Sequence, residues 1–263
     1  MRAPNIKLFA SLPFFRVTMT STLILVICSL RHVISLKPII ACVGDSITKG
    51  LGASNLNTTS YPALLQEHPG FRHFSVRNFG VGGTTAIRAS NQSFWSTEAF
   101  QESLKCGPDI VILQLGTNDA KVRYWNITLY QEDYKGLAML YKTLPSKPII
   151  LLCIPPPLYS NISLIFQPQI LNDVIPKTVP ALAAETGSIL VDNFAALGGS
   201  GLTHPQYFLN SSQPIEWSKN DGIHPNDLGY KAIANNIAVI LRDYFSTHPR
   251  PKSKVVTPAP SHQ

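Results

Sequence analysis

Four short polar segments contain residue types that together can hydrolyse an ester. They read GDSIT at 44–48, GVGGTT at 80–85, GTND at 116–119 and DGIHPN at 221–226. A serine esterase needs a nucleophile, a base, a group that orients the base, and hydrogen-bond donors for the oxyanion. Each segment offers a residue suited to one of these tasks.

The nucleophile and its base come from the first and last of these segments. Ser46 supplies a hydroxyl directly after an apolar run, and His224 is a candidate base. Asp221, three residues earlier, can fold back within one turn and hold the imidazole tautomer. His204 also precedes a proline but has no such aspartate, so it is an internal control. We interpret Ser46, Asp221 and His224 as a catalytic triad.

The donors for an oxyanion come from three of the segments. We assign the backbone N–H groups of Ser46 and Gly83 and the side-chain amide of Asn118 to this task. A glycine lets the backbone approach a substrate closely. Asparagine supplies a neutral donor that carries no charge into the site.

Three neighbouring residues are candidates for substrate binding. Asp45 precedes the nucleophile, and Tyr124 and Trp125 follow the GTND segment. Aromatic faces suit the stacking of a sugar ring. The alternative for both aromatic residues is that they are packing or rim residues.

Each key residue also has a purely structural interpretation. Ser46 suits the N-cap of a helix, and Gly83 suits a tight turn. Asn118 is a common turn residue, and His224 can be a surface histidine. The joint occurrence of the four segments favours catalysis over four independent coincidences.

Strands and helices alternate along the chain. Apolar, β-branched runs predict strands at 38–43, 74–79, 109–115, 148–154 and 188–192. The clearest amphipathic helices are 128–143 and 226–245. This alternation predicts a mostly parallel sheet, covered on both faces because the runs are apolar throughout. Ligands of such sheets bind at the carboxyl ends of the strands, where three of the polar segments follow.

In this order, the four segments resemble the SGNH (GDSL) hydrolase family. Its signature Ser, Gly, Asn and His match Ser46, Gly83, Asn118 and His224, and its third triad member matches Asp221. The resemblance covers roughly 38–246. It implies an α/β fold, a flavodoxin-like three-layer α/β/α sandwich with a parallel five-stranded sheet of order 2-1-3-4-5. The first segment is Gly-Asp-Ser rather than the Gly-x-Ser-x-Gly of α/β-hydrolases.

The stretches LQLGTNDAK at 113–121 and LPSKPIILLCIPPP at 144–157 are similar to secreted SGNH carbohydrate acetylesterases, including sialate O-acetylesterase-like proteins. We therefore expect a carboxylic ester hydrolase that removes small acyl groups, above all O-acetyl groups from carbohydrates. One alternative is a lysophospholipase or acyl-thioesterase of the same family. Another is a catalytically inactive glycan-binding module, which the intact triad disfavours.

The formal net charge of +7 is concentrated at the chain ends. Residues 1–37 and 247–263 carry Lys and Arg but no acid, so 38–246 is close to neutral. This distribution gives no electrostatic sign of nucleic-acid binding. No cysteine or histidine spacing indicates a metal, and no motif indicates another cofactor. The expected partner is a small ester or an O-acetylated glycan.

The N-terminus predicts a secretory signal peptide at 1–35. A basic segment precedes the short apolar stretch 21–30, and VIS at 33–35 suits cleavage; Met19 is an alternative start. We expect a protein that is secreted or held in the secretory-pathway lumen, without stable membrane insertion; an uncleaved signal anchor is the alternative. Sequons predict glycosylation at Asn57, Asn91, Asn126, Asn161 and Asn210.

These features divide the chain into a signal peptide at 1–35, a hydrolase domain at 36–246 and a tail at 247–263. The tail is rich in proline and charge, and we expect it to be disordered. If the sheet has the order 2-1-3-4-5, Cys42 and Cys153 lie about two strand spacings apart, roughly 9–10 Å. A disulfide between them is not expected at that separation.

Overall fold

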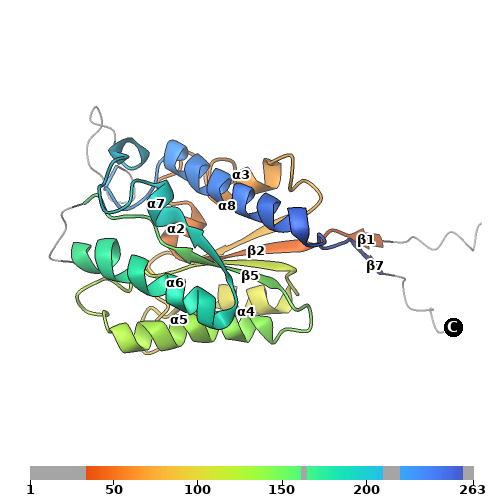
Figure 1. Ribbon diagram of the computed structural model, residues 1–263, viewed down its shortest axis with the longest axis horizontal. Helices are drawn as coiled ribbons and strands as arrows, with labels where there is room; N and C mark the ends of the chain where they lie inside the picture. The colour runs from red at the N-terminus through yellow and green to blue at the C-terminus, as the bar shows by residue number, and fades with distance from the viewer. Residues whose placement is uncertain (1–33, 161–164, 210–219, 257–263) are drawn as a thin grey trace, which may run out of the picture. The chain divides into compact units, whose positions relative to one another are not determined.

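A computed structural model of the chain describes residues 34–160, 165–209 and 220–256 (Figure 1). Nearly all of the predicted signal peptide, and the sequons at Asn161 and Asn210, lie outside the described residues. These features stay predictions.

Five parallel strands form the central sheet of the unit Lys37–Lys254. The strands are β2 (Ile39–Gly44), β3 (Ser75–Gly80), β4 (Ile110–Gln114), β5 (Ile149–Ile154) and β6 (Ile189–Asp192). Their order is β3-β2-β4-β5-β6, with every neighbouring pair parallel. Counted along the chain, this is 2-1-3-4-5, which confirms the predicted fold.

Helices cover both faces of this sheet (Figure 1). One face carries α4 (Glu98–Lys105), α5 (Ile127–Lys142) and α6 (Ile175–Thr186), and the other carries α3 (Tyr61–Glu67) and α8 (Asp227–Thr247). The two helices expected from the sequence correspond to α5 and α8. Short segments complete the connections, namely α2 (Ser46–Lys49), α7 (Asn193–Ala196), the 3₁₀ turns η1 (Phe94–Ser96) and η3 (Pro205–Tyr207), and the π-helical η2 (Ile170–Val174).

The two faces have separate hydrophobic cores, and β2 contributes to both. Ala41 and Val43 pack in the core under α4, α5 and α6, whereas Ile40 and Cys42 pack in the core under α3 and α8. Successive strand residues point to opposite faces of a sheet, so a strand covered on both sides needs apolar residues at every position. This explains the unbroken apolar run in the sequence.

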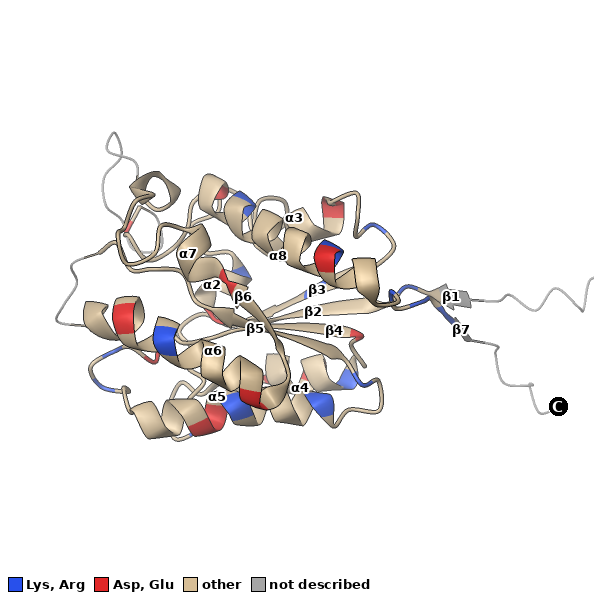
Figure 2. Cartoon of the chain, viewed as in Figure 1, with Lys and Arg blue, Asp and Glu red and all other residues tan. Residues whose placement is uncertain are grey.

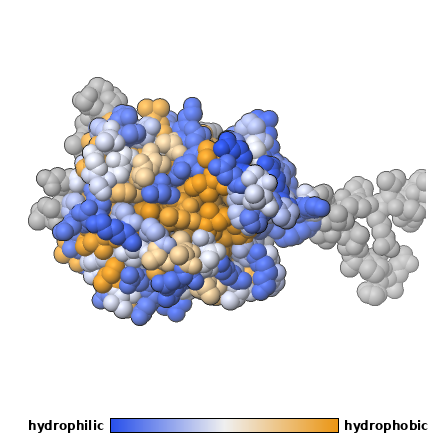
Figure 3. All heavy atoms as spheres, in the orientation of Figure 1, coloured by the Kyte–Doolittle hydropathy of each residue, from blue (hydrophilic) through white to orange (hydrophobic). Residues whose placement is uncertain are grey.

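The edge strand β6 is less buried than the central strands β2, β4 and β5. Its residues Ile189 and Leu190 are half-buried. Apolar surface is visible between α6 and α8 in Figure 3. Among the described cysteines, Cys42, Cys106 and Cys153 are all free thiols. Cys42 lies on β2 and Cys153 on β5, with β4 between them.

A separate two-stranded sheet pairs β1 (Ile34–Leu36) with β7 (Lys254–Val256). The segment 247–263, expected to be a disordered tail, therefore contains a strand at 254–256, and residues 257–263 lie outside the described part. No helix among the described residues is long and apolar enough to cross a bilayer.

Candidate active site

The polar segments meet because the central strands end in register. Gly44, the last residue of β2, lies opposite Gly80 of β3 and Gln114 of β4. The chain then turns immediately into α2, whose first residue is Ser46. A side chain at position 44 has no room in this turn, because its Cβ atom would lie 2.2 Å from Thr48 Oγ1. The glycine of the GDS segment is thus a packing requirement.

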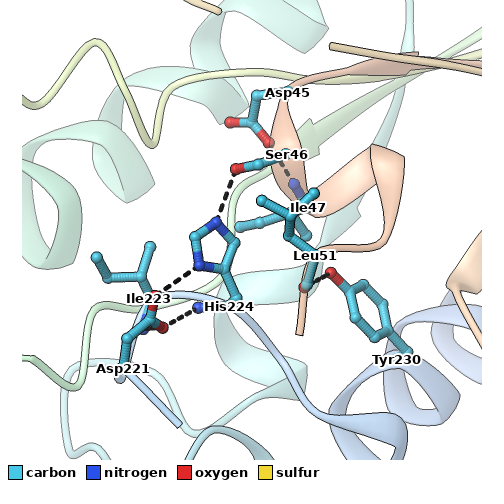
Figure 4. A network of polar contacts seen from close by, with 8 residues as sticks. All are labelled: Asp45, Ser46, Ile47, Leu51, Asp221, Ile223, His224 and Tyr230. Atoms are coloured by element: carbon cyan, nitrogen blue, oxygen red, sulfur yellow. Dashed lines mark hydrogen bonds and ion pairs between the residues drawn. The ribbon is translucent and has the colours of Figure 1, made fainter. Parts of the chain in front are cut away.

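Ser46, His224 and Asp221 form a hydrogen-bonded chain (Figure 4). The Nε2 atom of His224 lies 2.9 Å from Ser46 Oγ, and its Nδ1 atom lies 2.7 Å from Asp221 Oδ2. With the proton on Nδ1 donated to the carboxylate, Nε2 is free to accept the serine proton. All three side chains are buried. The structure brings together the three residues that the sequence indicated.

Asp221 is itself held by the backbone. Its Oδ1 atom accepts the N–H groups of Ile223 and His224, both at 2.9 Å. Burial alone would raise the pKa of Asp221, but the hydrogen bonds and charge of His224 outweigh it, and the pKa lies below its usual value. An ionised carboxylate therefore faces His224 near neutral pH.

Asp45 caps a helix and does not line the pocket. It is the N-cap of α2, and its Oδ1 atom accepts the Ile47 N–H at 2.9 Å (Figure 4). The capping role considered for Ser46 thus belongs to its neighbour. Burial raises the pKa of Asp45 to about 6. The side chain is 1% exposed and does not line the pocket, so direct substrate binding by Asp45 receives no support.

The three residues assigned to the oxyanion all line one pocket with His224. Gly83 has a φ of +84°, a conformation that favours glycine, and its N–H donates to no described residue. The Asn118 amide donates to the carbonyl of Thr84 at 3.1 Å, which joins the loop after β4 to the loop after β3. Its Nδ2 atom also lies 3.5 Å from Asp45 Oδ2.

Asp119 positions the loop that contains Gly83. Its two carboxylate oxygens accept the N–H groups of Ala86 and Ile87, each at 3.0 Å. The carboxylate is fully buried, and burial raises the pKa of Asp119 to about 7. Sequence reasoning did not assign this residue a role, although it is the final residue of the GTND segment.

The pocket beside Ser46 has a volume of about 690 Å³. This size is typical of small-molecule sites. Besides the candidate catalytic residues, apolar side chains line it, namely Leu51, Val122, Ile165, Phe166 and Ile223. The remaining polar side chains of the lining are Gln92, Thr117, Lys121 and Arg123. Sequence reasoning missed these four. The signal for two of them was the pair of basic residues in AKVR, directly after GTND.

The two aromatic candidates do not line this pocket. Trp125 packs against the core under α4, α5 and α6, and its ring centroid is 5.7 Å from that of Tyr130. The Tyr124 hydroxyl donates to Asn91 Oδ1 at 2.6 Å. Trp125 is therefore a packing residue, as in the alternative interpretation. It lies two residues before the start of α5 and packs against the same core as that helix.

Two other sequence predictions concern the surface and metal binding. The described sequons Asn57, Asn91 and Asn126 are all exposed, and their glycosylation stays a prediction. Within the described ranges, no group of three or more His, Cys, Asp or Glu side chains is placed to hold a metal ion.

Comparison with known proteins gives a consistent set of relatives. The model of a family described as GDSL-like Lipase/Acylhydrolase matches residues 42–232. An acetylxylan esterase from Xylanibacter ruminicola is 29% identical over 224 residues, which cover 77% of this chain and 43% of that protein. The chain thus spans less than half the length of this relative.

Solved structures share the fold. The lipase/acylhydrolase from Enterococcus faecalis aligns with a TM-score of 0.61 and 19% identity, over 81% of this chain and 99% of that chain. A two-domain esterase active on acetylated mannans aligns with a TM-score of 0.55 and 25% identity. That alignment covers 86% of this chain and 53% of the two-domain chain.

Proposed function

The chain belongs to the GDSL-like lipase/acylhydrolase family, and we propose that it is a serine esterase that removes small acyl groups, above all O-acetyl groups from carbohydrates. The observation that carries the proposal is the hydrogen-bonded chain from Ser46 through His224 to Asp221 at the wall of a pocket. A buried serine with a histidine at 2.9 Å and an aspartate behind it is the arrangement that activates a nucleophile.

In the proposed mechanism, Ser46 Oγ attacks the ester carbonyl carbon while His224 Nε2 takes the serine proton. The tetrahedral intermediate then collapses, the bond to the alcohol oxygen breaks, and His224 returns its proton to that oxygen. Water, deprotonated by His224, then attacks the acyl carbon of the acyl-enzyme. The bond to Ser46 Oγ breaks, His224 returns its proton to that oxygen, and the acid is released. Asp221 holds the imidazole in the required tautomer and stabilises its charged form.

The negative charge of each intermediate needs donors on the pocket wall. The backbone N–H groups of Ser46 and Gly83 and the amide of Asn118 are the proposed donors. Asn118 already donates to Thr84, so the orientation of its amide is fixed before a substrate arrives. Asp119 supports the same site by fixing the loop that contains Gly83.

The proposed sugar substrate is supported by the relatives and by the pocket. Two of the relatives are named for action on acetylated polysaccharides, xylan in one and mannans in the other. The pocket mixes apolar side chains with Gln92, Lys121 and Arg123, whose polar groups suit a hydroxylated ring.

Acetate release tests the proposal. The purified protein is incubated with acetylated xylo- and manno-oligosaccharides, and free acetate is measured over time. We expect release by the native protein and none above background by the Ser46→Ala variant. Ser200→Ala, which changes an exposed serine outside the pocket, is the matched control and should keep full activity. If Ser46→Ala retains more than about a tenth of the activity, Ser46 is not the nucleophile.

A long-chain esterase is the second candidate, because five apolar side chains line the pocket. The test is the hydrolysis of 4-nitrophenyl esters with acyl groups from acetyl to octanoyl. An inactive glycan-binding module would bind acetylated oligosaccharides without releasing acetate. The intact hydrogen-bonded chain disfavours this third candidate, since binding alone requires no activated serine.

We also propose that the protein enters the secretory pathway and is glycosylated there. The support is the signal-like segment 1–35 and the exposure of Asn57, Asn91 and Asn126. N-terminal sequencing of the mature protein from a eukaryotic host, with and without deglycosylation, tests both parts. A mature protein that begins at residue 1 and shows no mass shift would contradict them.

A further inference from the structure

A lysine lies in the pocket wall beside the nucleophile. Lys121 lines the same pocket as Ser46 and His224 and is only 8% exposed. Its backbone pairs with that of Phe166, and its ammonium lies 5.3 Å from the centre of the Phe166 ring. The side chain therefore lies against the ring of Phe166, which also lines the pocket.

No described acid neutralises this charge by direct contact. Lys121 makes no hydrogen bond or ion pair through its side chain to another described residue. The nearby carboxylates are already engaged: Asp119 accepts Ala86 and Ile87 N–H groups, and Asp45 caps α2. An ammonium group that no acidic side chain contacts favours an incoming anion at the pocket.

A second cation lies close by. Arg123 lines the pocket two residues after Lys121, and its guanidinium lies 4.5 Å from the centre of the Tyr124 ring. The described lining contains no Asp or Glu. Elsewhere on the hydrolase unit, acidic and basic side chains are interspersed (Figure 2). The pocket wall is thus more positive than the near-neutral body of the protein.

We infer that the acetyl ester taken by this pocket carries a carboxylate on its alcohol part, and that Lys121 binds this carboxylate with help from Arg123. The inference rests on the proposed esterase function and specifies its substrate class as an acidic O-acetylated sugar. Charge-assisted hydrogen bonds are stronger than neutral ones, so the carboxylate should raise kcat/KM.

Two kinds of sugar carry such a carboxylate, the uronic acids and the sialic acids. The test uses two matched pairs of substrates. The first pair is the O-acetylated methyl glycoside of galacturonic acid and its C6 primary amide. The second pair is O-acetylated N-acetylneuraminic acid and its C1 amide. Each amide keeps the sugar and the acetyl group but removes the charge. Acetate release gives kcat/KM for each compound, and the acid-to-amide ratio is taken within each enzyme.

The variants are Lys121→Gln, Lys121→Arg and, as a control, Lys105→Gln. Lys105 is exposed at the C-terminal end of α4, and its change alters net charge equally outside the pocket. We expect a ratio of about tenfold in at least one pair for the native protein and for Lys105→Gln. Lys121→Gln should bring that ratio close to one, and Lys121→Arg should keep part of it. Because each ratio compares two substrates of the same enzyme, a general loss of activity in a variant cancels.

The outcomes separate this inference from the proposed function. A preference in either pair that depends on Lys121 supports the inference, and the pair that shows it identifies the sugar. A ratio near or below one in both pairs, with acetate still released from neutral oligosaccharides, overturns the inference alone. A ratio that survives in Lys121→Gln overturns the assignment to Lys121. Absence of acetate release from every acetyl ester overturns the proposed function itself.

Discussion

Ser46 and His224 are 178 positions apart in the chain, and the Nε2 atom of the histidine lies 2.9 Å from the Oγ atom of the serine. Ser46 is placed by the end of β2, whereas His224 is placed by the loop before α8. The contact therefore depends on α8 packing against the same sheet face as α3.

Replacement of His224 by alanine should reduce ester hydrolysis by several orders of magnitude. The triad acts as a unit, so the loss should match that of the Ser46→Ala variant, and the double variant should be no worse. His204→Ala is the control, because His204 does not line the pocket and its Nδ1 atom pairs with Thr203 Oγ1. Steady-state kinetics on 4-nitrophenyl acetate measure all four. A severe loss in His204→Ala, with His224→Ala unaffected, would contradict the pairing with Asp221.

The Asn118→Ala variant should lower kcat by roughly 10²–10³-fold with little change in KM. An oxyanion donor acts mainly in the transition state, so its removal affects turnover more than ground-state binding. Circular dichroism should show a folded protein, because the variant loses only the bonds to Thr84 and Asp45. A raised KM with unchanged kcat would instead identify Asn118 as a residue that binds the substrate ground state.

Asp119 should make the protein less stable as the pH rises from 5 to 8. Burial raises the pKa of Asp119 to about 7, so the folded state holds a proton that the unfolded chain, with a pKa near 3.8, has released. Stability falls wherever the folded state binds more protons, and between pH 5 and 8 this group lowers the free energy of unfolding by roughly 2–3 kcal/mol.

Urea unfolding at pH 5, 6, 7 and 8 measures this dependence. The Asp119→Asn variant removes this titrating group and should make the pH profile less steep than that of the native protein, while Asp45, with a pKa of about 6, still contributes between pH 5 and 6. Asp173→Asn, at an exposed position, is the control and should follow the native profile. A native profile that rises with pH, or one that Asp119→Asn leaves unchanged, would show that Asp119 is ionised throughout this range.

Short acyl esters should be better substrates than long ones. The pocket has a finite volume of about 690 Å³, and polar and charged side chains interrupt its apolar lining. Each CH₂ group buried from water contributes about 0.8 kcal/mol, so an open acyl channel would make kcat/KM rise with chain length. We expect kcat/KM for 4-nitrophenyl esters to fall from acetyl to octanoyl. A steady rise would favour the lysophospholipase or thioesterase alternative, with the same nucleophile and base.

Local sequence pattern was sufficient to predict the strands, the two long helices and the residues of the proposed triad. Each strand run is apolar over consecutive residues, and each catalytic segment directly follows a run or precedes a helix, as with GDSIT after 38–43. In a parallel sheet, the carboxyl ends of the strands lie at one edge, so these segments had to converge. Asp221 and His224 are close enough in sequence for one turn to join them.

Tertiary packing decided which neighbouring side chains face the pocket. Trp125 and Lys121 are four residues apart in one loop, yet Trp125 packs into a core and Lys121 lines the pocket. The difference depends on the pairing of Lys121 with Phe166, which lies on a distant segment. Likewise, the Ser46 hydroxyl meets His224, 178 positions away in the chain, whereas the neighbouring Asp45 caps α2. Such choices depend on contacts between residues far apart in the chain, and local sequence pattern does not encode them.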